Sequence, residues 1–257
     1  MNITQTFYDS MASQYDKLFE DWNAATHEQA VILDNIFRRN GFDRSASVLD
    51  CACGIGTQSV GLAAMGYSVT GSDISNAELA EAEKRAKNLG VPLRLAHADF
   101  CALDRTFPET FDILICMDNA LPHMLSRDAL NSAIGSITAR IREGGIFVAS
   151  IRDYDALLQT KPPYSPPYIH KTETGQRVSF QTWTWEDDHY RLIQYILDDG
   201  ETLQAGKFEC EYRATRRAEI TELLTAHGCT DVTWLFPEES GFYQPLVVGR
   251  KQEKHHD

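Results

Sequence analysis

The amino-acid sequence predicts an α/β protein built around a doubly wound, parallel β-sheet. Two observations lead to this prediction. Short apolar runs alternate with helical stretches along the first 150 residues, which is typical of parallel strands joined by crossover helices. A glycine-containing turn also follows the first of these runs. The chain has 257 residues, more than a minimal domain of this kind needs, so additional segments are expected.

The first part of the chain predicts two helices that precede the sheet. Residues 1–22 carry apolar and aromatic side chains three to four positions apart, which is typical of one face of a short helix. Residues 24–40 repeat this spacing, and Gly41 marks the expected end of the second helix. We interpret residues 1–45 as an N-terminal helical lid.

Five apolar runs predict the parallel strands of a core over residues 46–152. In chain order they are SVLDCACG, YSVTGSD, LRLAHAD, FDILICMD and GGIFVASI. The helical stretches between them are 57–65, 75–89 and 126–141. The uncharged segments ILIC and IFVA suit strands that are buried on both faces.

The pattern then breaks over residues 153–214, which hold 10 of the 26 aromatic residues and 4 of the 9 prolines. The string KPPYSPPY excludes a helix or a central strand, and the β-rich segments after it predict an antiparallel meander. The core is expected to resume over 215–251, with a helix at 216–227 and the strands TDVTWLF and YQPLVVGR. Residues 252–257 are expected to form a solvated tail.

The composition is that of a globular protein, with 43% hydrophobic and 24% charged residues. The chain has 24 Lys and Arg against 37 Asp and Glu, a net charge of −13. Phosphate backbones and anionic membranes repel such a chain unless its basic residues cluster, and they do not. We therefore expect neither nucleic acid nor membrane as a partner. The absence of an apolar run of ~20 residues and of a secretory signal pattern leads us to expect a cytoplasmic protein.

The string VLDCACGIGT is the strongest local signal for a ligand. It runs from a strand through Gly54 and Gly56 into a helix, whose N-terminus offers free N–H donors. A dinucleotide fingerprint would need a third glycine where Ser59 stands, which disfavours a nicotinamide-dependent oxidoreductase. S-adenosylmethionine carries a sulfonium and an ammonium group, and it suits the acidic Asp50 beside the loop. A tight turn in a ligand-free α/β protein is the remaining alternative.

Acidic residues at the ends of the next two strands strengthen the cofactor interpretation. Asp73 ends the second strand, where a carboxylate can accept bonds from two ribose hydroxyls. Asp99 ends the third strand and can accept a bond from the exocyclic amine of adenine. Phe100 follows it and can cover a ring face.

These strings resemble the class I S-adenosylmethionine-dependent methyltransferases. DCACGIGT, YSVTGSDIS, HADF and FDILICMDN stand in the order of that family. The resemblance implies a Rossmann-like seven-stranded sheet whose last strand, PLVVGR, is antiparallel. It also implies S-adenosyl-L-methionine as cofactor and S-adenosyl-L-homocysteine as product. The residues it implies in the cofactor site are Tyr15, Asp50, Gly54, Gly56, Asp73, Ile74, Asp99, Phe100 and Met117. For Tyr15, in the string SQYDKLF, a core-facing position is the alternative.

Polar residues after the fourth and fifth strands indicate where a methyl acceptor binds. Ligands of open α/β sheets bind at this carboxyl edge. Asn119 offers both a donor and an acceptor, and His123 could orient a substrate or accept a proton. The guanidinium of Arg152 can bind a carboxylate through two parallel hydrogen bonds. The alternative is that Arg152 forms a surface ion pair with Asp153 or Asp155.

Together these strings resemble glycine N-methyltransferase and its relatives, which have Asn-x-x-x-His after the fourth strand, Arg-x-Tyr-Asp after the fifth, and then a β cap. The resemblance implies that Arg152 holds a substrate carboxylate and that Asn119 contacts the amine, with His123 supporting the site. Cap tyrosines such as Tyr168 or Tyr195 are expected to close over the substrate, or simply to pack the small sheet.

Two residues of the fourth-strand loop depart from that family. Asp118 and Pro122 replace its small residues, so the acceptor is less well defined than the cofactor. The prediction is N-methylation of a small amino acid or amine such as glycine or sarcosine. O- or C-methylation of a keto acid, amino sugar or natural-product intermediate is the alternative, as is a cofactor-binding protein without methyl transfer.

The cysteines do not indicate a metal. Cys51 and Cys53 form C-x-C, and no cysteine pair has zinc-ligand spacing with a second half elsewhere. We therefore expect a metal-free enzyme. The sequence leaves open whether it is a monomer or a homo-oligomer.

Overall fold

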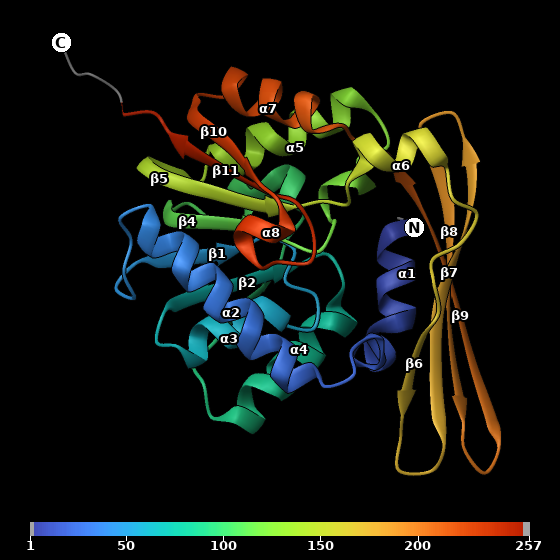
Figure 1. Cartoon of the computed structure of the whole chain (residues 1–257). Helices are drawn as coiled ribbons and strands as arrows, with labels where there is room; N and C mark the ends of the chain where they lie inside the picture. The colour runs from blue at the N-terminus through green and yellow to red at the C-terminus, as the bar shows by residue number, and fades with distance from the viewer. Residues whose placement is uncertain (1–2, 254–257) are drawn as a thin grey trace.

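The computed structural model describes residues 3–253, which form a large sheet with helices on both faces and a smaller antiparallel sheet beside it (Figure 1). The α-helices are α1 (Ile3–Met11), α2 (Trp22–Arg39), α3 (Thr57–Ala64), α4 (Asn76–Leu89), α5 (Arg127–Thr138), α6 (Tyr154–Thr160), α7 (Arg217–Ala226) and α8 (Pro237–Ser240). The 3-10 helices are η1 (Ala12–Leu18), η2 (Phe100–Arg105) and η3 (Leu121–His123). The strands of the large sheet are β1 (Ser47–Asp50), β2 (Ser68–Asp73), β3 (Arg94–His97), β4 (Phe111–Cys116), β5 (Ile141–Ser150), β10 (Cys229–Leu235) and β11 (Leu246–Lys251). Those of the small sheet are β6 (Tyr168–Lys171), β7 (Gln176–Glu186), β8 (His189–Asp199) and β9 (Leu203–Arg213).

The large sheet has seven strands in the order β10-β11-β5-β4-β1-β2-β3. Strands β1 to β5 are parallel, whereas β11 pairs antiparallel with both β5 and β10. The predicted fold class, including the antiparallel last strand, is confirmed. The chain order reverses direction between β1 and β4, so a crevice for ligands is expected at their carboxyl ends.

Both faces of this sheet are covered, as the uncharged strands predicted. Val48 and Leu49 are neighbours in β1, both are 0% exposed, and they belong to different hydrophobic clusters. The cluster of Val48 includes Leu33 of α2 and Leu62 of α3. The cluster of Leu49 includes Ile134 of α5. The helices of each layer therefore bury alternate residues of the same strands.

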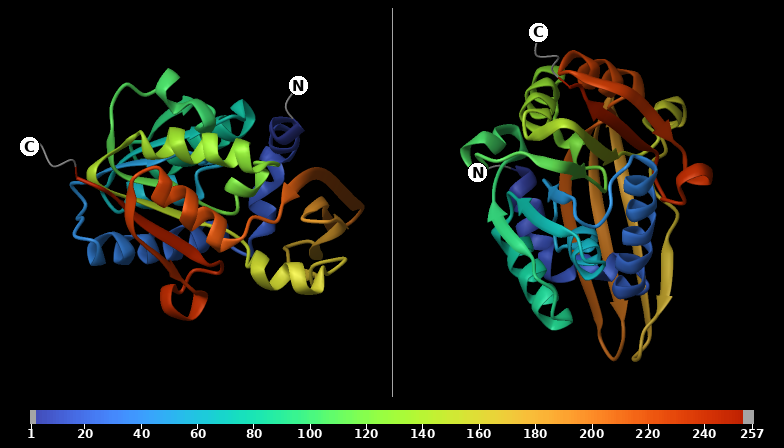
Figure 2. Two further views of the ribbon diagram at one scale, coloured as in Figure 1. Left: turned by 90° about the horizontal axis from the view of Figure 1, so that it is seen from above. Right: turned by 90° about the vertical axis from the view of Figure 1, so that its left-hand side faces the viewer.

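The small sheet has the strand order β6-β7-β8-β9, and α1 lies between it and the large sheet (Figure 1). Both views in Figure 2 keep the dark-blue α1 against the orange strands. Tyr190, Leu192 and Ile196 of β8 are buried, while Arg191 between them is exposed. Alternate residues of β8 thus face the rest of the molecule and the solvent.

Several local elements differ from the sequence prediction. The single helix expected within the first 22 residues is divided into α1 and η1. The β-rich segment begins with α6, whose C-cap residue Lys161 is in the left-handed region (φ 41°). The turns η2 and η3 and the short α8 also have no counterpart in the prediction. Residues 254–257 of the predicted tail lie outside the described residues. Among residues 3–253, no helix is long and apolar enough to cross a membrane.

Candidate active site

The glycine loop connects β1 to α3 at the carboxyl edge of the large sheet. Gly54 and Gly56 have φ values of +51° and +90°, which side chains other than glycine rarely adopt. The N–H of Gly54 donates to Oδ2 of Asp73 at 2.9 Å. At Gly56 a Cβ atom would lie 2.8 Å from Cγ2 of Val60. The loop is therefore fixed against the end of β2 and the start of α3.

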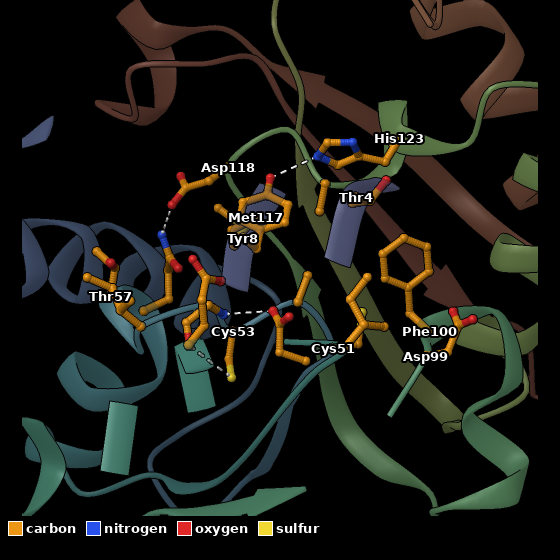
Figure 3. A pocket seen from close by; sticks show the side chains of 18 of the residues that line it. Thr4, Tyr8, Cys51, Cys53, Thr57, Asp99, Phe100, Met117, Asp118 and His123 are labelled. Carbon is orange, nitrogen blue, oxygen red and sulfur yellow. Dashed lines mark hydrogen bonds between the residues drawn. The ribbon is translucent and has the colours of Figure 1, made fainter. Parts of the chain in front are cut away.

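A pocket opens above this loop (Figure 3). Asp99 and Phe100 stand at one end of the view, and Thr57 and Asp118 stand at the other. The described residues that line the pocket come from α1, η1, the glycine loop, the first turns of α3 and α4, the carboxyl ends of β2, β3 and β4, and the turns η2 and η3 with their flanking residues. They are Thr4, Tyr8, Tyr15, Cys51, Ala52, Cys53, Gly54, Ile55, Thr57, Gln58, Asp73, Ile74, Glu78, Asp99, Phe100, Cys101, Met117, Asp118, Ala120, His123 and Met124.

The structure brings most of the residues predicted for the cofactor to this pocket. Those that line it are Tyr15, Gly54, Asp73, Ile74, Asp99, Phe100 and Met117. Asp50 and Gly56 do not line it. Asp50 is 0% exposed and accepts a bond from Oγ of Ser59 at 2.7 Å, so it lies beneath the loop. Burial raises the pKa of Asp50 to about 7, and this carboxyl group supports the loop from below.

The pocket is acidic. No described residue that lines it is Lys or Arg, whereas four are acids: Asp73, Glu78, Asp99 and Asp118. Burial raises the pKa of Asp73, Glu78 and Asp118. Such a surface favours a cation that can compensate the buried carboxylates. A sulfonium cofactor with a ribose and an adenine fits this set of donors, acceptors and apolar walls.

Asp118 and Asn119 follow β4 in left-handed backbone conformations, with φ values of 54° and 69°. The carboxylate of Asp118 accepts bonds from Nε2 of Gln58 and from the hydroxyl of Tyr243, both at 2.8 Å. The side chain of Asn119 is 2% exposed. Its Oδ1 accepts from the backbone N–H of Arg152 at 3.0 Å, and its Nδ2 donates to the hydroxyl of Tyr154 at 2.9 Å.

These bonds give Asn119 a structural role. Its amide already connects the end of β4 to the end of β5, and almost none of it reaches solvent. The expected contact of Asn119 with the acceptor amine stays a prediction. What the structure shows is that this residue fixes the backbone of Arg152.

Arg152 is surrounded by the neutral side chains of Gln181, Trp183, Tyr190 and Tyr212. We call these five residues the arginine cluster. Nη1 of Arg152 donates to the hydroxyl of Tyr190 at 2.6 Å, and its Nη2 donates to Oε1 of Gln181 at 3.0 Å. The guanidinium also lies 5.2 Å from the ring centre of Trp183 and 5.5 Å from that of Tyr212.

No carboxylate of residues 3–253 forms an ion pair with Arg152. The surface pairing considered from the sequence does not occur, because Asp153 and Asp155 pair with Arg217. Arg152 is thus a partly buried cation with only neutral partners, a state that an anionic ligand would stabilise.

His123 connects the pocket to the arginine cluster. It lines the pocket, and its ring packs on Tyr212 with 4.2 Å between ring centres. Its Nε2 shares a 2.8 Å hydrogen bond with the hydroxyl of Tyr8. Burial lowers the pKa of His123 to about 3, so the ring is neutral at physiological pH and too weak a base to take a proton from an ammonium. Of the two functions considered from the sequence, only orientation is compatible with this environment.

The cap tyrosines named from the sequence are not part of this arrangement. Tyr168 is on the edge strand β6 and is 64% exposed. Tyr195 faces outward from β8, where it stacks on Phe180 with 4.9 Å between ring centres. The expectation that Tyr168 and Tyr195 close over the substrate is wrong, because alternate residues of a strand face opposite sides. Tyr190 and Tyr212 occupy the inner face instead.

Further residues of the site that the sequence did not single out are Tyr8, Gln181 and Glu78. Tyr154 was visible within the Arg-x-Tyr-Asp string, and its hydroxyl bonds that of Tyr190 at 2.8 Å. Glu78 stands three residues after Ser75, a spacing that usually indicates a helix cap. Ser75 does cap α4 by accepting the N–H of Glu78, yet the Glu78 carboxylate enters the pocket.

The seven-stranded sheet with its reversed last strand, and the acid-lined pocket at its carboxyl edge, define a class I S-adenosylmethionine-dependent methyltransferase. A methyltransferase domain model matches residues 48–145. The glycine/sarcosine N-methyltransferase of Parasynechococcus marenigrum is 30% identical over 97% of this chain and 85% of its own length. Human glycine N-methyltransferase is 29% identical over 87% of this chain and 82% of its own length. An S-adenosylmethionine-dependent methyltransferase structure from Clostridium acetobutylicum superposes with a TM-score of 0.74 at 21% identity, covering 96% of this chain and 99% of that one.

The chain therefore belongs to the class I S-adenosylmethionine-dependent methyltransferases, and it is similar to the glycine and glycine/sarcosine N-methyltransferases. It is a methyltransferase that uses S-adenosylmethionine and acts on a small molecule. The nicotinamide-dependent oxidoreductase and the cofactor-binding protein without methyl transfer are thereby set aside.

Proposed function

We propose that the protein methylates the amino nitrogen of a small amino acid, glycine or sarcosine. The observation that carries this proposal is Arg152, a partly buried cation beside the pocket that has no carboxylate partner among residues 3–253. An amino acid brings the missing carboxylate together with a nucleophilic nitrogen. The names of the similar proteins, glycine and glycine/sarcosine N-methyltransferases, support the same acceptor.

The side chain of Arg152 is suited to orient this acceptor. A guanidinium has five N–H groups, and Arg152 uses one each for Tyr190 and Gln181. The remaining N–H groups hold the acceptor carboxylate. This fixes the nitrogen at one place in the pocket, and such positioning is a main contribution of the protein to a displacement reaction.

When bound, the cofactor supplies a methyl group already activated on a positively charged sulfur. Only the neutral amine can attack it, and His123 is too weak a base to remove the proton. The acceptor therefore loses its proton to solvent before it binds. Tyr8 and His123 orient the site through their mutual hydrogen bond.

We assign distinct tasks to the parts of the chain. Residues 46–152 and 215–251 form the cofactor-binding core, and residues 1–45 act as a lid that brings Tyr8 and Tyr15 to the pocket. Residues 153–214 act as a substrate cap, which provides the aromatic wall around Arg152. Together the lid and the cap exclude water from the reaction. A cytoplasmic location belongs to the same proposal.

A screen of acceptors with labelled S-adenosylmethionine tests this function. Glycine and sarcosine are expected to accept the label, whereas an amino sugar, which has no carboxylate, is expected to react poorly because it leaves Arg152 unpaired. Pyruvate, a carboxylate without an amine, is expected to accept none. Turnover of the amino sugar or of pyruvate without turnover of glycine or sarcosine would overturn the proposal.

A further inference from the structure

Glu78 is a buried carboxyl group in the cofactor pocket that has no partner for one of its oxygens. Its side chain extends from the first turn of α4 and is 1% exposed. Oε1 forms no hydrogen bond, although the residue lines the pocket. A buried carboxylate without a partner is costly, so a ligand that satisfies it gains affinity.

The position of this carboxyl group places it against the glycine loop. Oε2 of Glu78 lies 3.0 Å from the point where a Cβ of residue 54 would stand. It is therefore next to the part of the backbone that glycine leaves open for a ligand. The neighbouring acid, Asp73, already accepts the N–H groups of Gly54 and Ser75, both at 2.9 Å.

The charged surroundings of Glu78 are all acidic. The carboxyl groups that act on it are those of Asp73 at the end of β2 and Asp9 of α1. The other titratable groups that feel its charge are Tyr8, Tyr15 and Cys53. Among residues 3–253, no Lys, Arg or His forms an ion pair with Glu78. Burial and these acids raise the pKa of Glu78, and a cationic ligand would favour its charged form.

We propose that Glu78 is a further cofactor-binding residue, whose carboxylate is the counter-ion for a positively charged group of S-adenosylmethionine, either its ammonium or its sulfonium. The inference concerns the cofactor alone and does not depend on the acceptor proposed above. A failure of the acceptor screen therefore leaves it intact, and its own failure leaves the acceptor assignment intact.

The test is calorimetric binding of three ligands to the full-length wild-type chain and to Glu78→Gln, without acceptor or turnover. S-adenosylmethionine carries both cations, S-adenosylhomocysteine carries only the ammonium, and 5′-methylthioadenosine carries neither but keeps the ribose and adenine. The loss of a charge-assisted contact is expected to weaken binding about 10- to 100-fold. A loss shared by the first two ligands assigns the ammonium, and a loss confined to the first assigns the sulfonium.

An equal loss for all three ligands would mean that Glu78 contacts the ribose or adenine and would overturn the proposal, as would no loss at all. Glu78→Asp keeps the negative charge. This variant is expected to retain more affinity for S-adenosylmethionine than Glu78→Gln. Glu83→Gln is the matched control, because Glu83 is on the same helix, exposed, and paired with Lys87. Thermal unfolding of each variant verifies that it is folded, and Glu78→Met provides a second charge-free variant.

Discussion

Replacing Arg152 with methionine should abolish efficient use of the acceptor while leaving the cofactor site intact. A guanidinium and a carboxylate in a two-point contact form two charge-assisted hydrogen bonds, each contributing about 1.5–3 kcal/mol. Their loss costs about 3–6 kcal/mol, which lowers kcat/KM for the acceptor about 10²- to 10⁴-fold. Arg152→Lys keeps the charge but not the fork, so an intermediate loss is expected.

The structure also predicts that this variant folds. Without Arg152, the hydroxyl of Tyr190 still bonds that of Tyr154 at 2.8 Å. Oε1 of Gln181 still accepts from Nε1 of Trp183 at 3.0 Å. Because no partner is left unsatisfied, the free energy of unfolding is expected to fall by no more than about 1–2 kcal/mol.

Two assays check the prediction. Steady-state kinetics with labelled cofactor give kcat/KM for glycine or sarcosine, and calorimetry gives Kd for S-adenosylmethionine. The cofactor Kd is expected to stay within about twofold of wild type, because Arg152 does not line the pocket. An unchanged acceptor KM in a folded variant would refute the role of Arg152.

Three further predictions address the cap, the buried histidine and the glycine loop. Tyr190→Phe removes the hydroxyl that accepts from Arg152 and is expected to lower kcat/KM for the acceptor about 5- to 30-fold. The outward-facing Tyr195→Phe should stay within about twofold, and equal effects in the two variants would contradict the assignment. Burial lowers the pKa of His123 from 6.5 to about 3. Between these two pH values the imidazole is protonated in the unfolded chain but stays neutral in the folded chain. The free energy of unfolding should therefore fall from pH 6.5 to pH 3 more steeply in wild type than in His123→Gln, and parallel urea-unfolding curves would count against this pKa. Gly56→Ala is expected to cost about 2 kcal/mol or more, from its φ of +90° and the contact with Val60. Gly41→Ala is the control, since it has a similar φ of +87° and nothing within 4 Å, and thermal unfolding should show the smaller loss there.

Much of the fold could be predicted because its signals are local. Strand β4 contains the uncharged run ILIC, and the glycine loop follows β1 directly. These features set the parallel core and the edge at which the pocket opens. Helix α6 was missed because it is only seven residues long and is followed by four prolines within seven positions, which dominate the local pattern.

The face of the cap required the structure. Strand β8 has apolar residues on both of its faces. Leu192 and Ile196 face inward, whereas Ile193 and Leu197 are on the other face. Its alternation therefore does not indicate whether Tyr190 or Tyr195 faces the substrate. The contact of Tyr190 with Arg152 settles the direction, and it depends on how the cap packs against the end of β5.

The site shows the same division between local and long-range information. Asp73 ends β2, and Asp99 and Phe100 come shortly after the end of β3. Topology alone therefore brings these residues to the pocket. Glu78 was hidden by a spacing that also indicates a helix start. The lone cation of Arg152 became visible only when its neighbours were known, because Asp153 and Asp155 turn instead to Arg217 on α7.

The most direct test of carboxylate recognition by Arg152 compares glycine with methylamine as acceptors under saturating S-adenosylmethionine. Both have a primary amine, but only glycine has the carboxylate for which Arg152 lacks a partner. We expect a kcat/KM for glycine at least about 10²-fold above that for methylamine in wild type, and a much smaller ratio in Arg152→Met. Equal values for the two acceptors in wild type would mean that Arg152 does not recognise the acceptor carboxylate.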